Sequence, residues 1–105
     1  MNLLGGLTNT DMANKELGDF IASRRELVWY VKDPRALSEE SIVEAVLNYG
    51  NWKDVQKLID ILSIEKIAKI FREKSKPSNM GRQNYFPDVV HYFTLYFDKY
   101  APHAH

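Results

Sequence analysis

The sequence contains no cysteine among its 105 residues. This absence excludes disulfide scaffolds, thiol nucleophiles, iron–sulfur clusters and cysteine-based zinc sites. Nothing points to an oxidising compartment, so we expect a cytoplasmic protein. Long apolar runs are also missing, because the longest, from Leu27 to Val31, has five residues. The sequence therefore predicts neither a membrane-spanning segment nor a secretory signal.

Net charge is absent as well, since 14 Lys and Arg residues match 14 Asp and Glu residues. The hydrophobic content of 45% is typical of a globular protein. A chain of this length forms one domain and buries about two thirds of its surface. We predict a flexible arm over residues 1–10, a single helical domain over residues 11–100 and a disordered tail over residues 101–105.

The spacing of apolar residues predicts helices and no strands. One or two helices are expected over residues 11–30, and Pro34 ends that part of the chain. Three short helices should follow before Lys74, and a last helix should run from Pro87 to about Tyr100. Residues 74–87 read as a flexible basic loop. The predicted fold class is all-α, a compact bundle of about five helices with this loop before the last helix.

Capping residues separate the three middle helices. Ser38 or Ser41 can cap the first of them, and Gly50 stands where a left-handed residue would end it. Asn51 can cap the second helix, with Asp54 in its first turn. Ser63 can cap the third. Tyr49 and Trp52 are expected on the apolar stripes of these helices.

Aromatic rings are concentrated near the carboxyl end, where eight ring-bearing residues fall within 85–100. Phe86, Val90, Phe93, Phe97 and Tyr100 form one helical stripe, and further rings widen it. The helix could thread the middle of the bundle, with the phenol hydroxyls reaching water. Alternatively, the rings that one helix face cannot bury bind a protein partner, because Tyr and Phe are enriched at interfaces. A third alternative is that these rings stack on nucleic-acid bases. The predicted partner-binding residues are Tyr85, Tyr92, Tyr96 and Tyr100.

A local excess of positive charge is hidden by the neutral total. Six Lys and Arg residues against Glu73 alone give residues 66–82 a balance of +5. A helix face exposed to solvent explains this pattern without a binding function. The functional alternatives are that these residues bind an acidic protein surface or the phosphate backbone of a nucleic acid. The predicted basic patch comprises Lys66, Lys69, Arg72, Lys76 and Arg82.

Signals of catalysis are weak. The histidines are His91, His103 and His105, which do not form the clustered ligands of a metal site. Glu39 and Glu40 are adjacent at a helix start rather than convergent in a pocket. No phosphate loop, dinucleotide fingerprint or nucleophile elbow occurs. We therefore predict a protein that is not an enzyme and uses no cofactor or metal.

Short motifs over about residues 27–97 resemble a family of small all-α prokaryotic proteins encoded beside abortive-infection-type nucleotidyltransferase toxins. The motifs are Trp-Tyr-Val-Lys-Asp-Pro at 29–34, Leu-Asn-Tyr-Gly at 47–50, Asn-Trp-Lys-Asp at 51–54, an Ile-rich helix from Ile64 to Ser75, and Tyr-Phe-Thr-Leu-Tyr-Phe at 92–97. The sequence departs from the family's layout in two places: the loop between Ser75 and Tyr85 is longer, and the N-terminal extension through Ile21 has no counterpart. The resemblance implies an antitoxin-like protein that sequesters a toxin by surface contact.

Three functions therefore remain open. The leading hypothesis is a non-enzymatic protein–protein interaction module, an antitoxin-like partner of a nucleotidyltransferase toxin. The alternatives are a nucleic-acid-binding regulator that uses residues 66–82 and a structural homodimer in which two aromatic helices cover each other.

Overall fold

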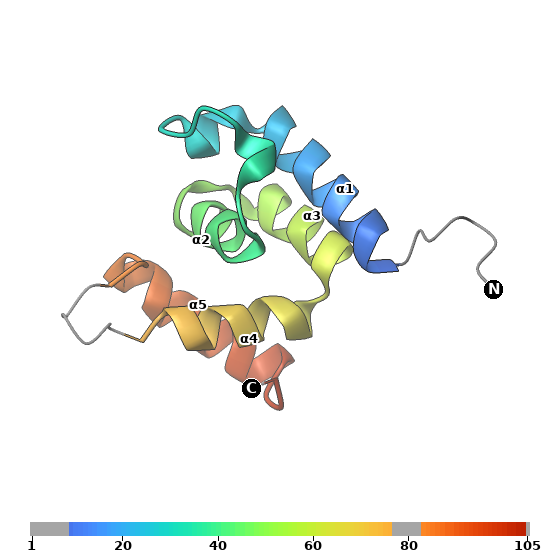
Figure 1. Ribbon diagram of the computed structural model, residues 1–105. Coiled ribbons are helices and arrows are strands. Elements are labelled where there is room, and N and C mark those ends of the chain that lie inside the picture. Colours follow the sequence, from blue (N-terminus) through green and yellow to red (C-terminus); the bar gives the residue numbers. More distant parts are fainter. Residues whose placement is uncertain (1–8, 77–82, 105) are drawn as a thin grey trace.

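The computed structural model describes residues 9–76 and 83–104, with side chains from residue 14 onward, and over these residues the chain is helical without strands (Figure 1). The elements are α1 (Asn9–Ser23), the 3-10 turns η1 (Arg25–Val28) and η2 (Pro34–Ala36), α2 (Glu39–Tyr49), α3 (Trp52–Leu62), α4 (Ile64–Lys74) and α5 (Pro87–Tyr100). The all-α prediction with five α-helices is confirmed. None of the described helices has the length and apolar character needed to cross a membrane. Most of the predicted arm and the centre of the predicted flexible basic loop lie outside the described residues.

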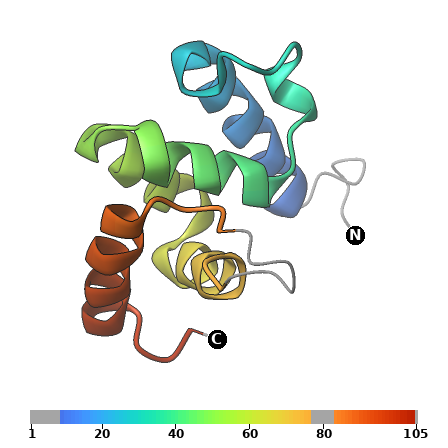
Figure 2. The ribbon, with the colours of Figure 1, turned by 90° about the vertical axis from the view of Figure 1, so that its left-hand side faces the viewer.

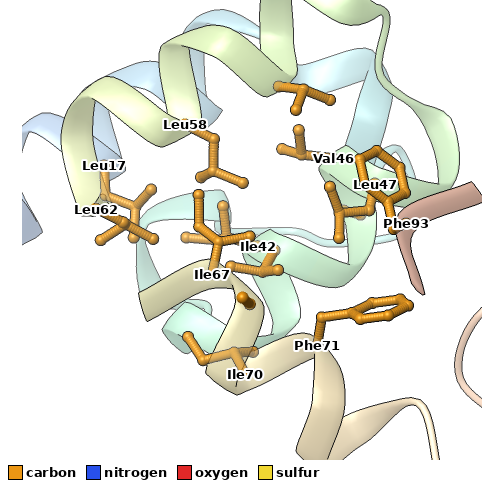
Figure 3. Close-up of a cluster of buried hydrophobic side chains, with 14 of the residues drawn as sticks. Leu17, Ile42, Val46, Leu47, Leu58, Leu62, Ile67, Ile70, Phe71 and Phe93 are labelled. Atoms are coloured by element: carbon orange, nitrogen blue, oxygen red, sulfur yellow. The ribbon is translucent and has the colours of Figure 1, made fainter. Parts of the chain in front are cut away.

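The helices enclose one apolar core. α2 packs against both α3 and α4, α1 packs against α3 and η2, and α5 packs against α4. In the two views α1 and α5 lie on opposite sides of the molecule (Figures 1 and 2). Figure 3 shows Leu58 and Leu62 of α3 beside Ile67 of α4, while Phe71 of α4 lies toward Phe93 of α5. Because α5 lies at the edge, only one of its faces reaches this core.

Capping explains where the middle helices begin. Ser38, rather than Ser41, caps α2 by accepting a hydrogen bond from the Ser41 N–H. Asn51 and Asp54 form a complete capping box at α3: the Asp54 N–H donates to Asn51 Oδ1, and the Asn51 N–H donates to Asp54 Oδ2, each at 2.9 Å. Two backbone donors that the helix leaves unpaired are thereby satisfied.

Gly50 does not adopt the predicted left-handed conformation. Its φ of −79° and ψ of 166° are extended, and any residue could adopt them. Glycine is needed here for a different reason, because a Cβ would lie 2.7 Å from the Val46 carbonyl oxygen and 3.0 Å from the Asp54 Cβ. The close approach of the α2 end to the α3 start therefore requires a residue without a side chain.

Ser63 joins α3 to α4 with a positive φ of 79° and a ψ of 150°. Residues with a side chain rarely occupy this region of the Ramachandran map. The Ser63 hydroxyl accepts a hydrogen bond from the Lys66 N–H, as the predicted cap of α4 requires. The serine thus caps α4 in a strained backbone conformation.

A partly buried ion pair joins Arg24, the residue after α1, to Asp54 in the first turn of α3. Arg24 donates from Nε to Asp54 Oδ1 at 2.8 Å and from Nη2 to Asp54 Oδ2 at 2.9 Å. Asp54 is only 5% exposed, and no other described charged residue is classed as buried. The hydrogen bonds from Arg24 hold the pKa of the Asp54 carboxyl below its usual range, against the effect of burial.

The carboxyl tail is placed through Ala104, which differs from the predicted disorder of residues 101–105. Ala101 is buried, and Arg72 of α4 donates to the Ala101 carbonyl oxygen at 2.7 Å and also to that of Ala104. Ala101 is the C-cap of α5, and a guanidinium near the C-terminal end of a helix is a favourable arrangement. His105 lies outside the described residues.

Candidate interaction surface

The buried face of α5 is built from rings. Phe97 lies 5.4 Å from Phe71 of α4 between ring centroids, and Phe93 lies 6.3 Å from the same ring. Tyr85, just before the helix, packs edge-on against Phe71 at 5.0 Å. Tyr85 is 1% exposed, so its predicted role in partner binding is wrong: this ring belongs to the core. Its hydroxyl is buried without a hydrogen-bond partner among the described atoms.

Eight large apolar side chains of the described residues stay between 42% and 63% exposed. They are Trp29, Tyr30, Tyr49, Trp52, Phe86, Tyr92, Leu95 and Tyr100. Large exposed side chains of this kind mark interaction sites when they are contiguous. Ring contacts connect seven of them, together with Tyr96, into two clusters, and Leu95 lies beside one of these clusters.

The first cluster, which we call the α5 face, comprises Trp52, Tyr92, Leu95, Tyr96 and Tyr100. Tyr96 lies at its centre, 5.3 Å from Trp52, 6.2 Å from Tyr92 and 4.8 Å from Tyr100 between ring centroids. Partial burial raises the pKa of the Tyr96 phenol, and the neighbouring phenols add to this effect. Three of the four tyrosines predicted for partner binding therefore do lie together on one surface.

A groove lies on each side of Leu95. One is lined by Tyr92, Leu95, Tyr96, Lys99 and Tyr100, and the other by Gln83, Pro87, Val90, His91, Thr94 and Leu95. Leu95 therefore forms a ridge between two hollows on the exposed side of α5. Such a ridge with flanking grooves matches the geometry by which helices pack on one another.

The second cluster, which we call the ring ladder, comprises Tyr30, Trp29, Tyr49 and Phe86 in order of contact. Successive rings meet edge to face, with centroids 5.1, 5.1 and 5.4 Å apart. Burial and the charge of Glu44 raise the pKa of the Tyr30 phenol. The ladder connects the turn that follows η1, the end of α2 and the N-cap of α5.

Sequence reasoning missed both the ladder and the part that Trp52 plays. Helical spacing places Tyr49 and Trp52 on apolar stripes and Phe86 and Tyr100 on the inward stripe of α5, but all four side chains are exposed. Periodicity identifies a stripe without showing how far the neighbouring helix extends to cover it. The pair Trp29 and Tyr30 inside the longest apolar run was the one available signal.

Comparison with known protein families, with curated proteins and with solved structures gives no match. The resemblance to toxin-associated proteins therefore stays a prediction.

The predicted basic patch is divided among different roles. Lys66 forms an ion pair with Glu39 at 2.9 Å, and Arg72 binds the tail carbonyls and Asp98. Lys69 and Lys76 are exposed, but α4 ends at Lys74, so Lys76 does not share its helical face. Arg82 lies outside the described residues. Of the predicted patch, Lys66 and Arg72 thus have partners within the chain, and Lys69 and Lys76 are exposed.

Among the described residues no group of three or more His, Cys, Asp or Glu side chains is arranged to hold a metal ion. The buried carboxylate, Asp54, is already paired with Arg24 and the Asn51 N–H. His91 and His103 are both exposed. What the arrangement offers chemically is two clusters of rings, with hydroxyl and indole groups that can hydrogen-bond to a partner.

Proposed function

We propose that this chain is a non-enzymatic protein-interaction module that binds through the α5 face and the ring ladder. The supporting observation is the exposure of eight large apolar side chains, seven of them aromatic, that gather in two clusters. A chain with a complete core gains nothing by leaving these rings in water. Tyr and Trp are the side chains most enriched at the centres of protein interfaces.

The energetic argument is one of area. A buried aromatic side chain removes about 150–250 Å² from water, and apolar burial contributes roughly 25 cal/mol per Å². Covering the exposed half of one such ring therefore contributes about 2–3 kcal/mol before the cost of association. Two or three rings acting together are enough to supply the central contacts of an interface.

The partner that the sequence resemblance implies is a nucleotidyltransferase toxin of the abortive-infection type, which would give the chain an antitoxin-like role. Binding through apolar rings would sequester such a toxin by surface contact and would need no cofactor. The ring ladder suits this role, because it spans three separate elements and so presents a wide surface.

A co-expression experiment tests the proposal. The chain is produced with the nucleotidyltransferase encoded beside it, and the complex is captured through a tag on the toxin. We expect Trp29→Ala or Tyr49→Ala to reduce capture, whereas Gln56→Ala, an exposed change on α3 outside both clusters, leaves it unchanged. Equal capture of all three variants, or no capture of the unchanged chain, would refute the role.

The same material separates protein binding from the nucleic-acid alternative. A regulator that holds phosphates through lysines must lose affinity steeply as salt rises. Binding to apolar rings should change little over the same range. The engagement of Lys66 and Arg72 within the chain favours the protein-binding alternative.

A further inference from the structure

The exposed side of α5 carries a regular stripe of four residues, Asp88, Tyr92, Leu95 and Lys99. Their spacings of four, three and four residues place them on one narrow face of a helix. At about 100° per residue this face lies opposite Phe93 and Phe97, which are buried against α4. α5 is therefore apolar on two opposite sides, and only one of them is covered within the chain.

The ends of the stripe carry opposite charges. Asp88 lies in the first turn and Lys99 in the last turn of α5. Within the described part of the chain neither forms an ion pair, and the Lys99 Nζ lies 5.3 Å from the centroid of the Tyr100 ring. The apolar residues Tyr92 and Leu95 lie between the two charges.

Two copies of this stripe that run in opposite directions place opposite charges side by side at both ends. If a second α5 lies antiparallel, with a two-fold axis between positions 93 and 94, each Asp88 is level with Lys99 of the second copy. In the same register each Tyr92 is level with Leu95 of the second copy. A parallel arrangement would instead bring the two Asp88 carboxylates together. The antiparallel arrangement is an isologous two-fold contact, in which each residue pair occurs twice.

We propose that α5 packs antiparallel against α5 of a second copy of this chain, with two Asp88 to Lys99 pairs at the ends and Tyr92 and Leu95 at the centre. This inference rests on the proposed function, because it names the occupant of the α5 face. The Leu95 ridge of each copy then enters the groove that Tyr92, Tyr96 and Tyr100 form on the other. The ring ladder stays available for a different protein.

The expected area sets the expected affinity. A helix of 14 residues is about 21 Å long. With Trp52 and Tyr100 at its margins, the contact buries roughly 600 Å² per copy, or about 1,200 Å² in total, at the lower end for specific interfaces. The dimer should therefore be reversible, with a dissociation constant in the micromolar range (~1–100 μM).

Sedimentation equilibrium at protein concentrations from about 1 μM to several hundred μM tests the proposal, because this range spans the expected dissociation constant. The unchanged chain should pass from monomer to dimer and no further. Leu95→Ala removes one ridge from each copy and should weaken the dimer by more than about tenfold. Gln56→Ala is the matched exposed control and should have no effect.

Charge exchange tests the antiparallel register itself. Asp88→Lys and Lys99→Asp each place like charges opposite one another twice, and each should weaken the dimer roughly tenfold. The double exchange should restore the dissociation constant to within about threefold of the original, because opposite charges meet again. Each exchange opposes the helix dipole, so the double variant should have the lowest thermal midpoint of all. If the double variant regains the dimer although its fold is the least stable, the recovery comes from the restored charge pairs and not from a more stable fold.

The outcomes distinguish this inference from the proposed function. A chain that stays monomeric throughout the range overturns the antiparallel pair, and so does a double exchange that dissociates further. If the monomeric chain still captures the toxin through α5, so that Leu95→Ala abolishes capture, the interaction module stands with a different occupant. If no toxin is captured either, both proposals fail.

Discussion

Removing the carboxylate of Asp54 should destabilise the fold strongly and in a pH-dependent way. This side chain, 7% exposed, accepts two hydrogen bonds from Arg24 and one from the Asn51 N–H. Loss of the capping-box partner costs about 1 kcal/mol, and loss of a charged hydrogen bond costs about 1.5–3 kcal/mol. The alanine variant also avoids the cost of burying the carboxylate charge, which offsets part of these losses. We therefore expect Asp54→Ala to lower the free energy of unfolding by about 2–3 kcal/mol.

A loss of this size is readily measured. For a chain of about 100 residues it corresponds to a fall of roughly 10–15 °C in the thermal midpoint. Urea unfolding at neutral pH gives the free-energy difference directly. Asp60→Ala, which removes an exposed carboxylate from the same helix, is the matched control and should change the midpoint little.

The pH dependence tests the mechanism. The pKa of Asp54 is lowered in the folded chain, so its contribution is complete above the unfolded value of about 3.9 and is lost as the pH falls through the folded value. The difference between the unchanged chain and Asp54→Ala should therefore be constant from about pH 5 to 8 and narrow below about pH 4. A difference below about 0.5 kcal/mol at neutral pH, or one that does not narrow in acid, would refute this account of the α1–α3 connection.

Three further substitutions test local features by thermal unfolding. Gly50→Ala should destabilise, although the extended backbone alone would make it favourable by about 0.4–1 kcal/mol, because the new methyl group meets the Val46 carbonyl oxygen; a rise in the midpoint would contradict the clash. Ser63→Gly should stabilise by about 0.5–1 kcal/mol, since relief of the positive φ outweighs a weaker cap, whereas Ser63→Ala should destabilise. Tyr85→Phe should be neutral or stabilising by up to about 2 kcal/mol, because the buried hydroxyl it removes has no partner among the described atoms; a clear loss would show that the hydroxyl is hydrogen-bonded.

Local rules predicted the local structure well. The caps at Asn51, Asp54 and Ser63 and the bounds of the last helix depend on neighbouring residues alone, and the structure agrees with them. Gly50 was placed correctly at a helix end for the wrong reason. Its requirement arises from contact between two helices, which no rule about one helix contains.

Burial was harder to predict than secondary structure. The sequence correctly indicated more rings near the carboxyl end than one helix face could bury, since Phe86, Tyr92 and Tyr100 are exposed. Which of these rings stay exposed depends on where α5 crosses α4. As a result Tyr85 is buried in the core, whereas Phe86 is exposed. Arg72 shows the same limit, because its acceptors lie 29 and 32 residues away in the chain.

The two tryptophans offer the most direct test of the central claim that both ring clusters are docking surfaces, because Trp29 belongs to the ring ladder and Trp52 to the α5 face. The measurement is quenching of their fluorescence by acrylamide in Trp29→Phe and Trp52→Phe proteins, each with one indole left. We predict that Trp52 becomes protected as the protein concentration rises and Trp29 only when the toxin is added. Quenching of both indoles that is unchanged by concentration and by toxin would contradict the account.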